Sequence, residues 1–245
     1  MNNIGEITKV SRVHLIGITK PSAYTGCVDA NELVAYAARV SNPDNQNSKE
    51  TAPRLLRYLI NHAHWSPLEM VSITMEIVTT RDISRQIIRH RSFSYQEFSQ
   101  RYAEATSFIG REARLQDPKN RQNSIELELS DYGKGGEGSE STKAERLAEQ
   151  WHMKQREVIN AARSTYQWAI ANGIAKEQAR AVLPEGNTET TLYMAGSLRS
   201  WVHYCQLRRE NGTQKEHMVI AHKCWDIIRQ HFPDIAEAVD GYSYQ

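Results

Sequence analysis

MVSITMEIVTTRDISRQIIRHRSFSYQEFSQR, residues 70–101, carries the clearest structural pattern in this 245-residue chain. Apolar and polar side chains alternate over residues 70–79, which predicts a strand with one buried face. The apolar positions are Val71, Ile73, Met75 and Ile77. The segment then continues into a helix with arginines at positions 81, 85 and 89. The pattern predicts a half-buried strand that leads directly into an arginine-bearing helix.

The arginines of this predicted helix are spaced four apart, so they would lie about 40° from one another on one face. Ile83 and Ile87 would point the other way. Arginine binds phosphate and carboxylate oxygens through two parallel hydrogen bonds and keeps its charge. A solvated face with scattered ion pairs is the alternative. It is weaker here because the cationic run continues to residue 101, with Glu97 as its only carboxylate after residue 89.

The size of the chain, 28.0 kDa, predicts one domain over residues 1–245. The net charge of +1 and the pI near 7.8 do not indicate a nucleic-acid-binding surface. No apolar run approaches the roughly 18 residues that a membrane span requires. Residues 1–11 lack the apolar core of a signal peptide. Three scattered cysteines do not form a disulfide framework. We therefore expect a cytoplasmic protein that binds neither membrane nor nucleic acid.

Strands and helices are mixed along the chain without a regular repeat. Residues 10–19 and 190–195 are expected to be extended. Helices are expected at 29–40 (with Asp29 and Glu32 as a capping box), 48–62, 142–172, 197–210 and 214–231. Gly173 would cap the long helix and Pro233 would stop the last one. The expected fold class is α+β: a single mixed domain whose central, mostly antiparallel sheet is packed by helices, with the long helices in the C-terminal half.

Residues 117–141 form the least ordered part of the pattern, and we expect a mobile loop at 131–141. Residues 133–138 match G-x-G-x-x-G after a strand-like alternation that begins at Ile125. A dinucleotide-binding fingerprint requires a short βαβ unit. The residues that follow instead read as one long helix. A surface loop is therefore the favoured interpretation.

The histidines and cysteines do not show the spacing of a metal site. His62 and His64 are two apart, His217 and His222 are five apart, and no H-E-x-x-H or C-x-x-C motif is present. We therefore predict no metal. Cys205 could be a nucleophile if a neighbouring cation stabilised its thiolate, but its apolar neighbours favour packing in the core.

Arg180 and Arg208 lie in otherwise apolar segments. An arginine on a packed face needs an anion or a planar partner, because a buried unpaired charge costs several kcal/mol. From the residues alone, a structural carboxylate and a bound ligand are equally good partners for each.

The pattern R-H-R, seven residues, then S, which runs from Arg89 to Ser99, resembles the signature of the flavin-dependent thymidylate synthases. This family is unrelated to the thymidylate synthases that use a cysteine nucleophile. Further segments resemble the family in the same order, so the resemblance covers about residues 30 to 230. They are Ala37–Ser41, His64–Glu69, Arg180–Pro184 and Ser197–Arg208.

The resemblance implies two sets of binding residues. Deoxyuridine monophosphate (dUMP) would be bound by Gln86, Arg89, Glu97, Ser99, Gln100, Arg101, Arg180 and Arg208. Flavin adenine dinucleotide (FAD) would be contacted by Ser41, His64, Ser66, Glu69, Arg89, His90, Arg91, Glu97, Ser197, Arg199 and His203. Four positions depart from the commoner pattern of the family: Met70, Gln100, Ser197 and His203.

The implied reaction is the reductive methylation of dUMP to dTMP. In it, 5,10-methylenetetrahydrofolate supplies the carbon, reduced FAD the hydride, and NADPH regenerates the flavin. Arg208 would stabilise charge on the uracil and Ser99 would position the substrate, so both count as catalytic residues. The resemblance also implies a homotetramer with shared active sites. We expect the arginine helix of one subunit to meet Arg180 and Arg208 of another.

Three alternatives remain open at this point. A non-catalytic nucleotide- or RNA-binding protein could use the arginine cluster for phosphates. A flavoprotein reductase of another substrate could share the flavin residues. A monomer could simply pair its surplus arginines with some of its 29 acidic residues.

Overall fold

A computed structural model describes residues 11–127 and 143–241. Its central sheet has the strand order β1-β2-β6-β3, and every neighbouring pair is antiparallel. These strands are β1 (Arg12–Ile18), β2 (Ser72–Thr80), β6 (Glu189–Ser197) and β3 (Ser94–Glu97). A separate two-stranded sheet pairs β4 (Arg114–Gln116) with β5 (Ser124–Glu126). The α+β class and the antiparallel sheet are confirmed.

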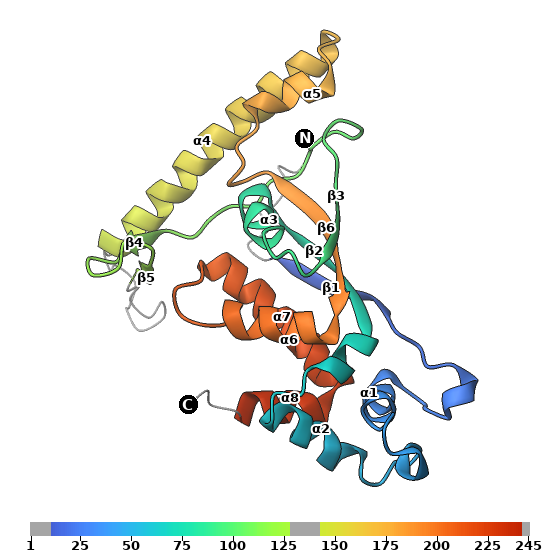
Figure 1. The fold of residues 1–245 in the computed structure, drawn as a ribbon. Coiled ribbons are helices and arrows are strands. Elements are labelled where there is room, and N and C mark those ends of the chain that lie inside the picture. The colour runs from blue at the N-terminus through green and yellow to red at the C-terminus, as the bar shows by residue number, and fades with distance from the viewer. Residues whose placement is uncertain (1–10, 128–142, 242–245) are drawn as a thin grey trace, which may run out of the picture.

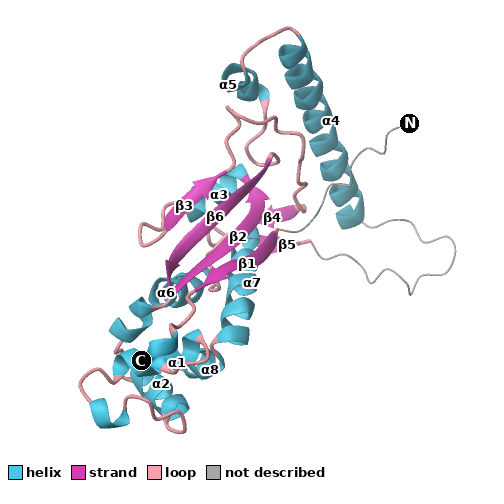
Figure 2. Ribbon diagram, turned by 90° about the vertical axis from the view of Figure 1, so that its right-hand side faces the viewer, coloured by secondary structure: helices cyan, strands magenta, loops and turns pink. Residues whose placement is uncertain are grey.

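Helices surround this sheet (Figure 1). They are α1 (Ala30–Ala38), α2 (Ala52–Asn61), α3 (Arg81–Ile87), α4 (Lys143–Ala171), α5 (Lys176–Ala179), α6 (Leu198–Arg208), α7 (Lys215–His231) and α8 (Pro233–Gly241). Short 3-10 turns lie at Ala23–Thr25, Pro43–Asn45, Ser66–Met70 and Arg180–Val182. Figure 2 shows α1, α2 and α8 gathered beyond one end of the sheet and α4 beyond the other. Among the described helices, none is both long and apolar enough to cross a membrane.

Most of the predicted elements are confirmed. The Asp29 side chain caps α1 by accepting from the Glu32 amide at 2.8 Å, while the Glu32 carboxylate accepts from the Val28 amide rather than from that of Asp29. Gly173, with φ of 77°, turns the chain after α4. The second predicted helix begins at Ala52, four residues later than expected, with Pro53 in its first turn. Proline is favoured there because the first turn needs no amide donor from it.

The core extends from the sheet into the helices: α6 packs against β6 and α7, α7 against β1, and α8 against α2 and α7. Trp201 of α6 is fully buried and donates its indole N–H to the Ile73 carbonyl of β2 at 3.1 Å. Gly196, next to the end of β6, allows a close approach of Phe93: a Cβ there would lie 2.5 Å from its ring. The Phe93 ring in turn packs edge-on against Trp201. This contact holds the turn after α3 against the sheet.

The arginine helix is shorter than predicted. α3 ends at Ile87, so Arg89 lies beyond it, and the prediction that Arg81, Arg85 and Arg89 share one helix face was wrong. The chain turns because the Tyr95 hydroxyl lies 2.9 Å from the Ile87 carbonyl and 2.8 Å from the His90 carbonyl. The single hydroxyl proton of Tyr95 is shared between these two carbonyls, and the contact links the end of α3 to β3, which contains Tyr95.

The long helix α4 has a small core of its own. Ile159 and Tyr166 pack with Phe108 and Leu183, which belong to the segments before and after the helix. Gln155 fixes the helix to the main body: its amide accepts from the Arg111 amide at 2.7 Å and donates to the Arg111 carbonyl at 2.8 Å. The predicted mobile loop at 131–141 and the glycine run 133–138 lie outside the described residues. The single-domain assignment stays a prediction.

Candidate active site

The R-H-R turn presents two arginine side chains, unpaired among the described residues, beside a half-buried histidine. Arg89 and Arg91 are exposed, and within residues 11–127 and 143–241 neither side chain has a hydrogen-bond or ion-pair partner. His90, between them, turns inward, and its ring meets that of Tyr204 edge-on at 4.9 Å. The turn therefore exposes the guanidinium groups of Arg89 and Arg91 to solvent, while the His90 ring between them packs against Tyr204.

His90 contacts Arg208, which comes from the end of α6. The Arg208 Nε donates to the His90 Nε2 at 2.9 Å. Burial, and then the charge of Arg208, lowers the pKa of His90 to about 4. A neutral imidazole agrees with the geometry, because arginine has no acceptor atoms and Nε2 must supply a lone pair.

Gln86 contacts a second histidine, His217, which is fully buried. The Gln86 Oε1 lies 3.4 Å from the His217 Nδ1, and the Gln86 Nε2 donates to Gln214 at 2.7 Å. The other nitrogen of His217 lies 3.0 Å from the Tyr204 hydroxyl. Burial, followed by the charge of Arg208, lowers the pKa of His217 to about 3. The neutral ring therefore donates to Gln86 and accepts from Tyr204.

The Glu97 carboxylate, predicted to contact both dUMP and FAD, forms hydrogen bonds and ion pairs with other residues of the chain. Its carboxylate accepts from Ser84 at 2.8 Å and from Thr190 at 3.0 Å. Arg81 lies 3.7 Å and Arg85 3.9 Å from the same carboxylate. For these two arginines, the ion-pair alternative is the correct one. Their charges attach the start of α3 to β3.

Arg101 and Arg180 form a separate group at the far end of the sheet. The Arg101 Nε lies 3.1 Å from the Glu177 carboxylate, and the Arg180 Nε donates to the Glu177 carbonyl at 3.3 Å. The expectation that Arg180 would accompany Arg208 was wrong within one chain. Arg180 directly follows α5 and Arg208 ends α6, with β6 between them in the chain, and Figure 1 shows α5 and α6 near opposite ends of β6.

Ser99 and Gln100 lie in the loop that leads to Arg101. The Ser99 hydroxyl accepts from the Arg101 amide at 3.3 Å. Gln100 is buried, at 4% exposure, and its Nε2 has no hydrogen-bond partner among the described residues. Buried amide donors are nearly always satisfied, so an unpaired one beside predicted binding residues suits a ligand.

Four of the predicted flavin residues meet where β6 passes into α6. The Glu69 carboxylate accepts from Arg199 at 2.9 Å. Hydrogen bonding from Ser197, ahead of that from Arg199, lowers the pKa of Glu69. His203 lies edge-on to Trp65 at 4.7 Å, and burial lowers its pKa. The departures at Ser197 and His203 thus belong to one polar cluster.

Three further predicted flavin residues are exposed. Ser41 follows α1, while His64 and Ser66 lie in the turn between α2 and β2. The turn is tight: Ala63 has φ of 53°, and the His64 amide donates to the Leu59 carbonyl at 2.8 Å. The structure brings neither Ser41 nor His64 into hydrogen-bond contact with the other predicted flavin residues described. Met70 is also exposed.

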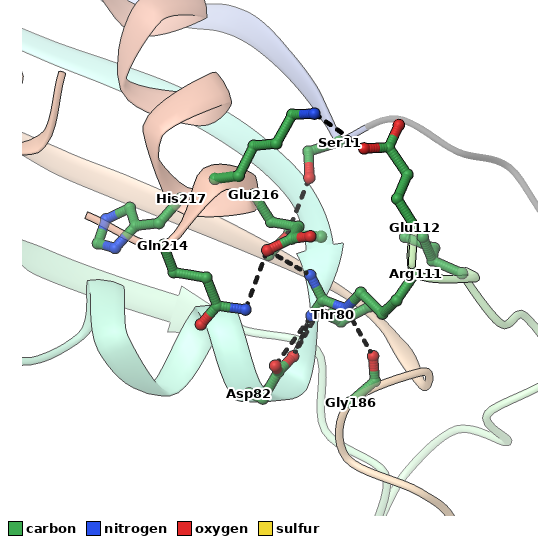
Figure 3. Close-up of polar contacts among 12 residues, drawn as sticks. Ser11, Thr80, Asp82, Arg111, Glu112, Gly186, Gln214, Glu216 and His217 are labelled. Carbon is green, nitrogen blue, oxygen red and sulfur yellow. Dashed lines mark hydrogen bonds and ion pairs between the residues drawn. The ribbon is translucent and has the colours of Figure 1, made fainter. Parts of the chain in front are cut away.

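A network of half-buried charged side chains adjoins these residues (Figure 3). Arg111 pairs with Asp82 at 2.6 Å and with Glu216 at 3.3 Å. Glu216 also accepts from Arg114, and from Gln214 at 2.9 Å. Because Gln214 bonds to Gln86, the network reaches the predicted substrate residues. It ties β4, α3 and α7 together.

Sequence reasoning missed His217, Tyr204 and Gln214 as supports of the site. His217 is 131 residues from Gln86 in the chain, so no local pattern links them. One weak signal was present in the sequence. His217 lies in a predicted helix with many apolar residues, and a buried histidine needs hydrogen-bond partners for its ring nitrogens.

Well-formed pockets occur elsewhere in the described chain. The largest of those described, about 730 Å³, lies between the β4–β5 sheet, the start of α4 and the turn before α7, and includes Trp151, Arg121 and Lys215. The residues described contain no group of three or more histidine, cysteine or acidic side chains placed to hold a metal.

Cys205, considered above as a nucleophile, is fully buried. Burial raises the pKa of its thiol, so it stays protonated. Its alternative role as a packed core side chain is the one that the structure supports.

Three comparisons with known proteins show what this chain is similar to. The family model described as "Thymidylate synthase complementing protein" matches residues 23–234. A flavin-dependent thymidylate synthase of Synechocystis is 46% identical over 231 residues, which cover 93% of this chain and 99% of that one. A probable flavin-dependent thymidylate synthase of Paramecium bursaria Chlorella virus 1 is 45% identical over 92% of this chain and 97% of its own. A solved UMP/dUMP methylase, PolB of Streptomyces cacaoi, shares the fold, with a TM-score of 0.74, 24% identity and 96% coverage of both chains.

Proposed function

This chain belongs to the flavin-dependent thymidylate synthase family, and from that membership we propose how its residues divide the methylation of dUMP. The enzyme is a methyltransferase that uses FAD, with a folate and a reductant as co-substrates. The observation that carries the residue assignment is the contact of Arg208 with His90, a pair that comes from two distant segments, with Gln86 connected to it through His217, whose ring faces that of His90. Nucleotide recognition needs such a convergence of amide and guanidinium donors.

The donors of this chain fit the two phosphate-bearing ligands. Arg89 and Arg91 offer guanidinium groups that no described carboxylate neutralises, and Gln100 offers an unpaired buried amide. Phosphate oxygens bind such forked, permanently charged donors well. Arg199 and Glu69 would hold the polar edges of the flavin from the start of α6. Ser41, His64 and Ser66 would contact it from the exposed loops.

When bound, reduced FAD supplies a hydride and methylenetetrahydrofolate supplies the carbon that becomes the methyl group; we propose NADPH as the reductant. Arg208 keeps its charge and would stabilise the negative charge that develops on the uracil as C5 reacts. Ser99 would donate a hydrogen bond from its hydroxyl group to the substrate and thereby position the substrate. No described histidine of the same chain hydrogen-bonds to that hydroxyl, and the role that we propose for Ser99 is positioning.

We propose that the active site is shared between subunits of a homotetramer. Within one chain, Gln86 contacts the start of α7 and Arg208 ends α6, whereas Arg101 and Arg180 both contact Glu177 of α5. Figures 1 and 2 show α5 and α6 well apart in both views. We therefore propose that one nucleotide contacts the two groups on different chains. A site built from both groups therefore needs a second chain.

α4 offers a surface for such an assembly. Four large apolar side chains lie on one side of this helix by their spacing and are 41–61% exposed: Leu147, Trp151, Val158 and Trp168. Apolar patches of this kind are typical of protein–protein contacts. The three cysteines are free, which suits the cytoplasmic location that we also propose.

Purification of the full chain tests the function. We expect a yellow protein whose flavin spectrum changes when dUMP is added, and which forms dTMP only when methylenetetrahydrofolate and NADPH are both present. A colourless protein that retards labelled RNA would contradict the enzyme assignment. A flavoprotein that oxidises NADPH but shows no spectral response to dUMP would be a reductase of another substrate.

A further inference from the structure

The hydrogen bond between His90 and Arg208 restricts how the guanidinium can be used. Arginine carries five N–H donors in one plane. The Nε–H is directed at His90 at 2.9 Å, which leaves the two terminal amino groups free of that contact. A bond at Nε also fixes the rotation of the planar group. Arg208 is thereby limited to its outer edge, the pair of Nη atoms, for binding a ligand.

His90 is itself held from several sides. Its carbonyl accepts from the Tyr95 hydroxyl at 2.8 Å, and its amide donates to the Ile87 carbonyl at 3.0 Å. Its ring packs edge-on against Tyr204. A side chain fixed in this way can transmit its own position to the group that it contacts.

We propose that His90 is the positioning residue of Arg208, which holds the guanidinium so that its two Nη groups face the uracil ring. This role rests on the substrate-stabilising function proposed for Arg208. It differs from the flavin contact that the resemblance implies for His90. The histidine touches neither reacting atom and acts through the arginine.

The electrostatic surroundings keep His90 in the state that this role requires. Arg208 and the ring of His217 face it from α6 and α7, and Tyr204 and Tyr95 from α6 and β3. No carboxylate among the described residues forms an ion pair with it. With a pKa of about 4, His90 remains an acceptor at neutral pH.

Replacements at position 90 test the proposal. His90→Gln keeps an acceptor near the place of Nε2, whereas the shorter His90→Asn and the apolar His90→Leu do not reach Arg208. We expect His90→Leu and His90→Asn to lower kcat on the order of 10²-fold, the usual cost of a misplaced catalytic group, while bound FAD is retained. His90→Gln should recover most of the loss. His222→Leu, which removes an exposed histidine of α7, is the matched control and should behave as wild type.

A double-mutant cycle measures the coupling between His90 and Arg208 in dUMP binding. A purely structural role of His90 would not produce this coupling. The dissociation constant of dUMP, read from the flavin spectrum, is compared in His90→Leu, Arg208→Ala and the double variant. If His90 acts through Arg208, the double variant binds dUMP no more weakly than Arg208→Ala.

Additive losses, together with reduced FAD binding in His90→Leu, would overturn the proposal and make His90 a flavin contact. Should His90→Leu fail to fold, the contrast between His90→Gln and His90→Asn decides: equal activity in these two variants would also overturn it. A wild-type protein that neither binds dUMP nor forms dTMP would instead refute the proposed function.

Discussion

Arginine side chains have three different parts in this protein. Arg81 and Arg111 are partners of internal carboxylates. Arg209 lies over the ring of Trp225, with 4.3 Å between the guanidinium carbon and the ring centre. Arg89 and Arg91 remain open to a ligand. Residue type alone could not separate these parts, because the same planar charge serves carboxylate, aromatic ring and phosphate.

Arg208→Ala should keep the fold and the flavin and lower turnover by about 10²–10³-fold, because one charge-stabilising donor is lost. Steady-state kinetics with dUMP measures this. The neighbouring Arg209→Ala is the control: it removes a cation–π contact worth about 1 kcal/mol and should lower stability, but not turnover per folded enzyme. Wild-type kinetics in Arg208→Ala would remove this residue from the mechanism.

The cysteines should be dispensable for the chemistry. Cys205 and Cys224 are fully buried, and burial raises the pKa of both thiols, so neither supplies a thiolate. A triple variant with Cys27, Cys205 and Cys224 replaced by alanine should form dTMP at the wild-type rate per bound flavin, although its melting temperature should fall. Loss of dTMP formation in a folded, flavin-bound triple variant would point to a thiol in the reaction.

Gly196→Ala should destabilise the protein by about 1–3 kcal/mol, since the new Cβ would lie 2.5 Å from the Phe93 ring in a packed core. Urea unfolding measures the change. Gly17→Ala is the matched control, because nothing lies within 4 Å of the added carbon, and it should alter stability by less than about 1 kcal/mol. Equal stability of the two variants would show that Phe93 moves aside without cost.

At the scale of elements, α6 joins two parts of the site. Arg199 lies in its first turn, with Glu69 and His203, and Arg208 at its end, with His90. Nine residues at 1.5 Å per residue separate the two arginines by about 13 Å along the axis. One helix therefore sets the spacing between the proposed flavin residues and the proposed substrate residue.

The packing of α7 against α6 makes stability depend on pH. His217 faces His90, Arg208 and Tyr204, and its pKa falls to about 3 in the folded protein from an ordinary value of 6.5. Above about pH 6.5 the ring is neutral in both the folded and the unfolded chain, so it has no effect. Below that pH the unfolded chain takes up a proton that the folded chain refuses, and stability falls as the pH drops toward 3.

His217→Gln should reduce this dependence, because an amide keeps a donor and an acceptor but does not titrate. Urea unfolding between pH 7 and pH 4, the range in which His90 also begins to contribute, compares the two proteins. A wild-type slope that is unchanged in His217→Gln would show that this histidine is not the group responsible.

At the scale of the whole molecule, the separation of the two substrate groups predicts a result for mixed subunits. Arg101→Ala and Arg208→Ala are each expected to be inactive. Mixing them after dissociation and reassembly should restore part of the activity, because some sites would draw Arg101 from an Arg208→Ala chain and Arg208 from an Arg101→Ala chain. Turnover of the mixture, with the assembly mass from sedimentation, is the measurement.

Arg101→Ala mixed with Arg180→Ala is the control for that experiment. These two arginines meet at Glu177 of the same chain, so every site would receive one defective arginine and no activity should return. A sedimentation mass near that of one 28.0 kDa chain, with no recovery in either mixture, would contradict the shared site.

The sequence by itself determined the family, the α+β class and most of the elements. Alternation over residues 70–79 and the caps at Asp29 and Gly173 are local properties, and local hydrogen bonding made them correct. The R-H-R segment carried the family resemblance from which the binding residues are proposed. These features are encoded by neighbours in the chain, so a single sequence contains them.

The tertiary structure alone decided which of those residues meet. It ended α3 before Arg89, paired Glu97 with Arg81, and placed Arg180 with Arg101 rather than with Arg208. It also brought His217 to Gln86 and His90 to Arg208, contacts that span 131 and 118 residues. Such contacts depend on how the sheet and helices pack, and packing energy is spread over the whole core rather than written in any local pattern.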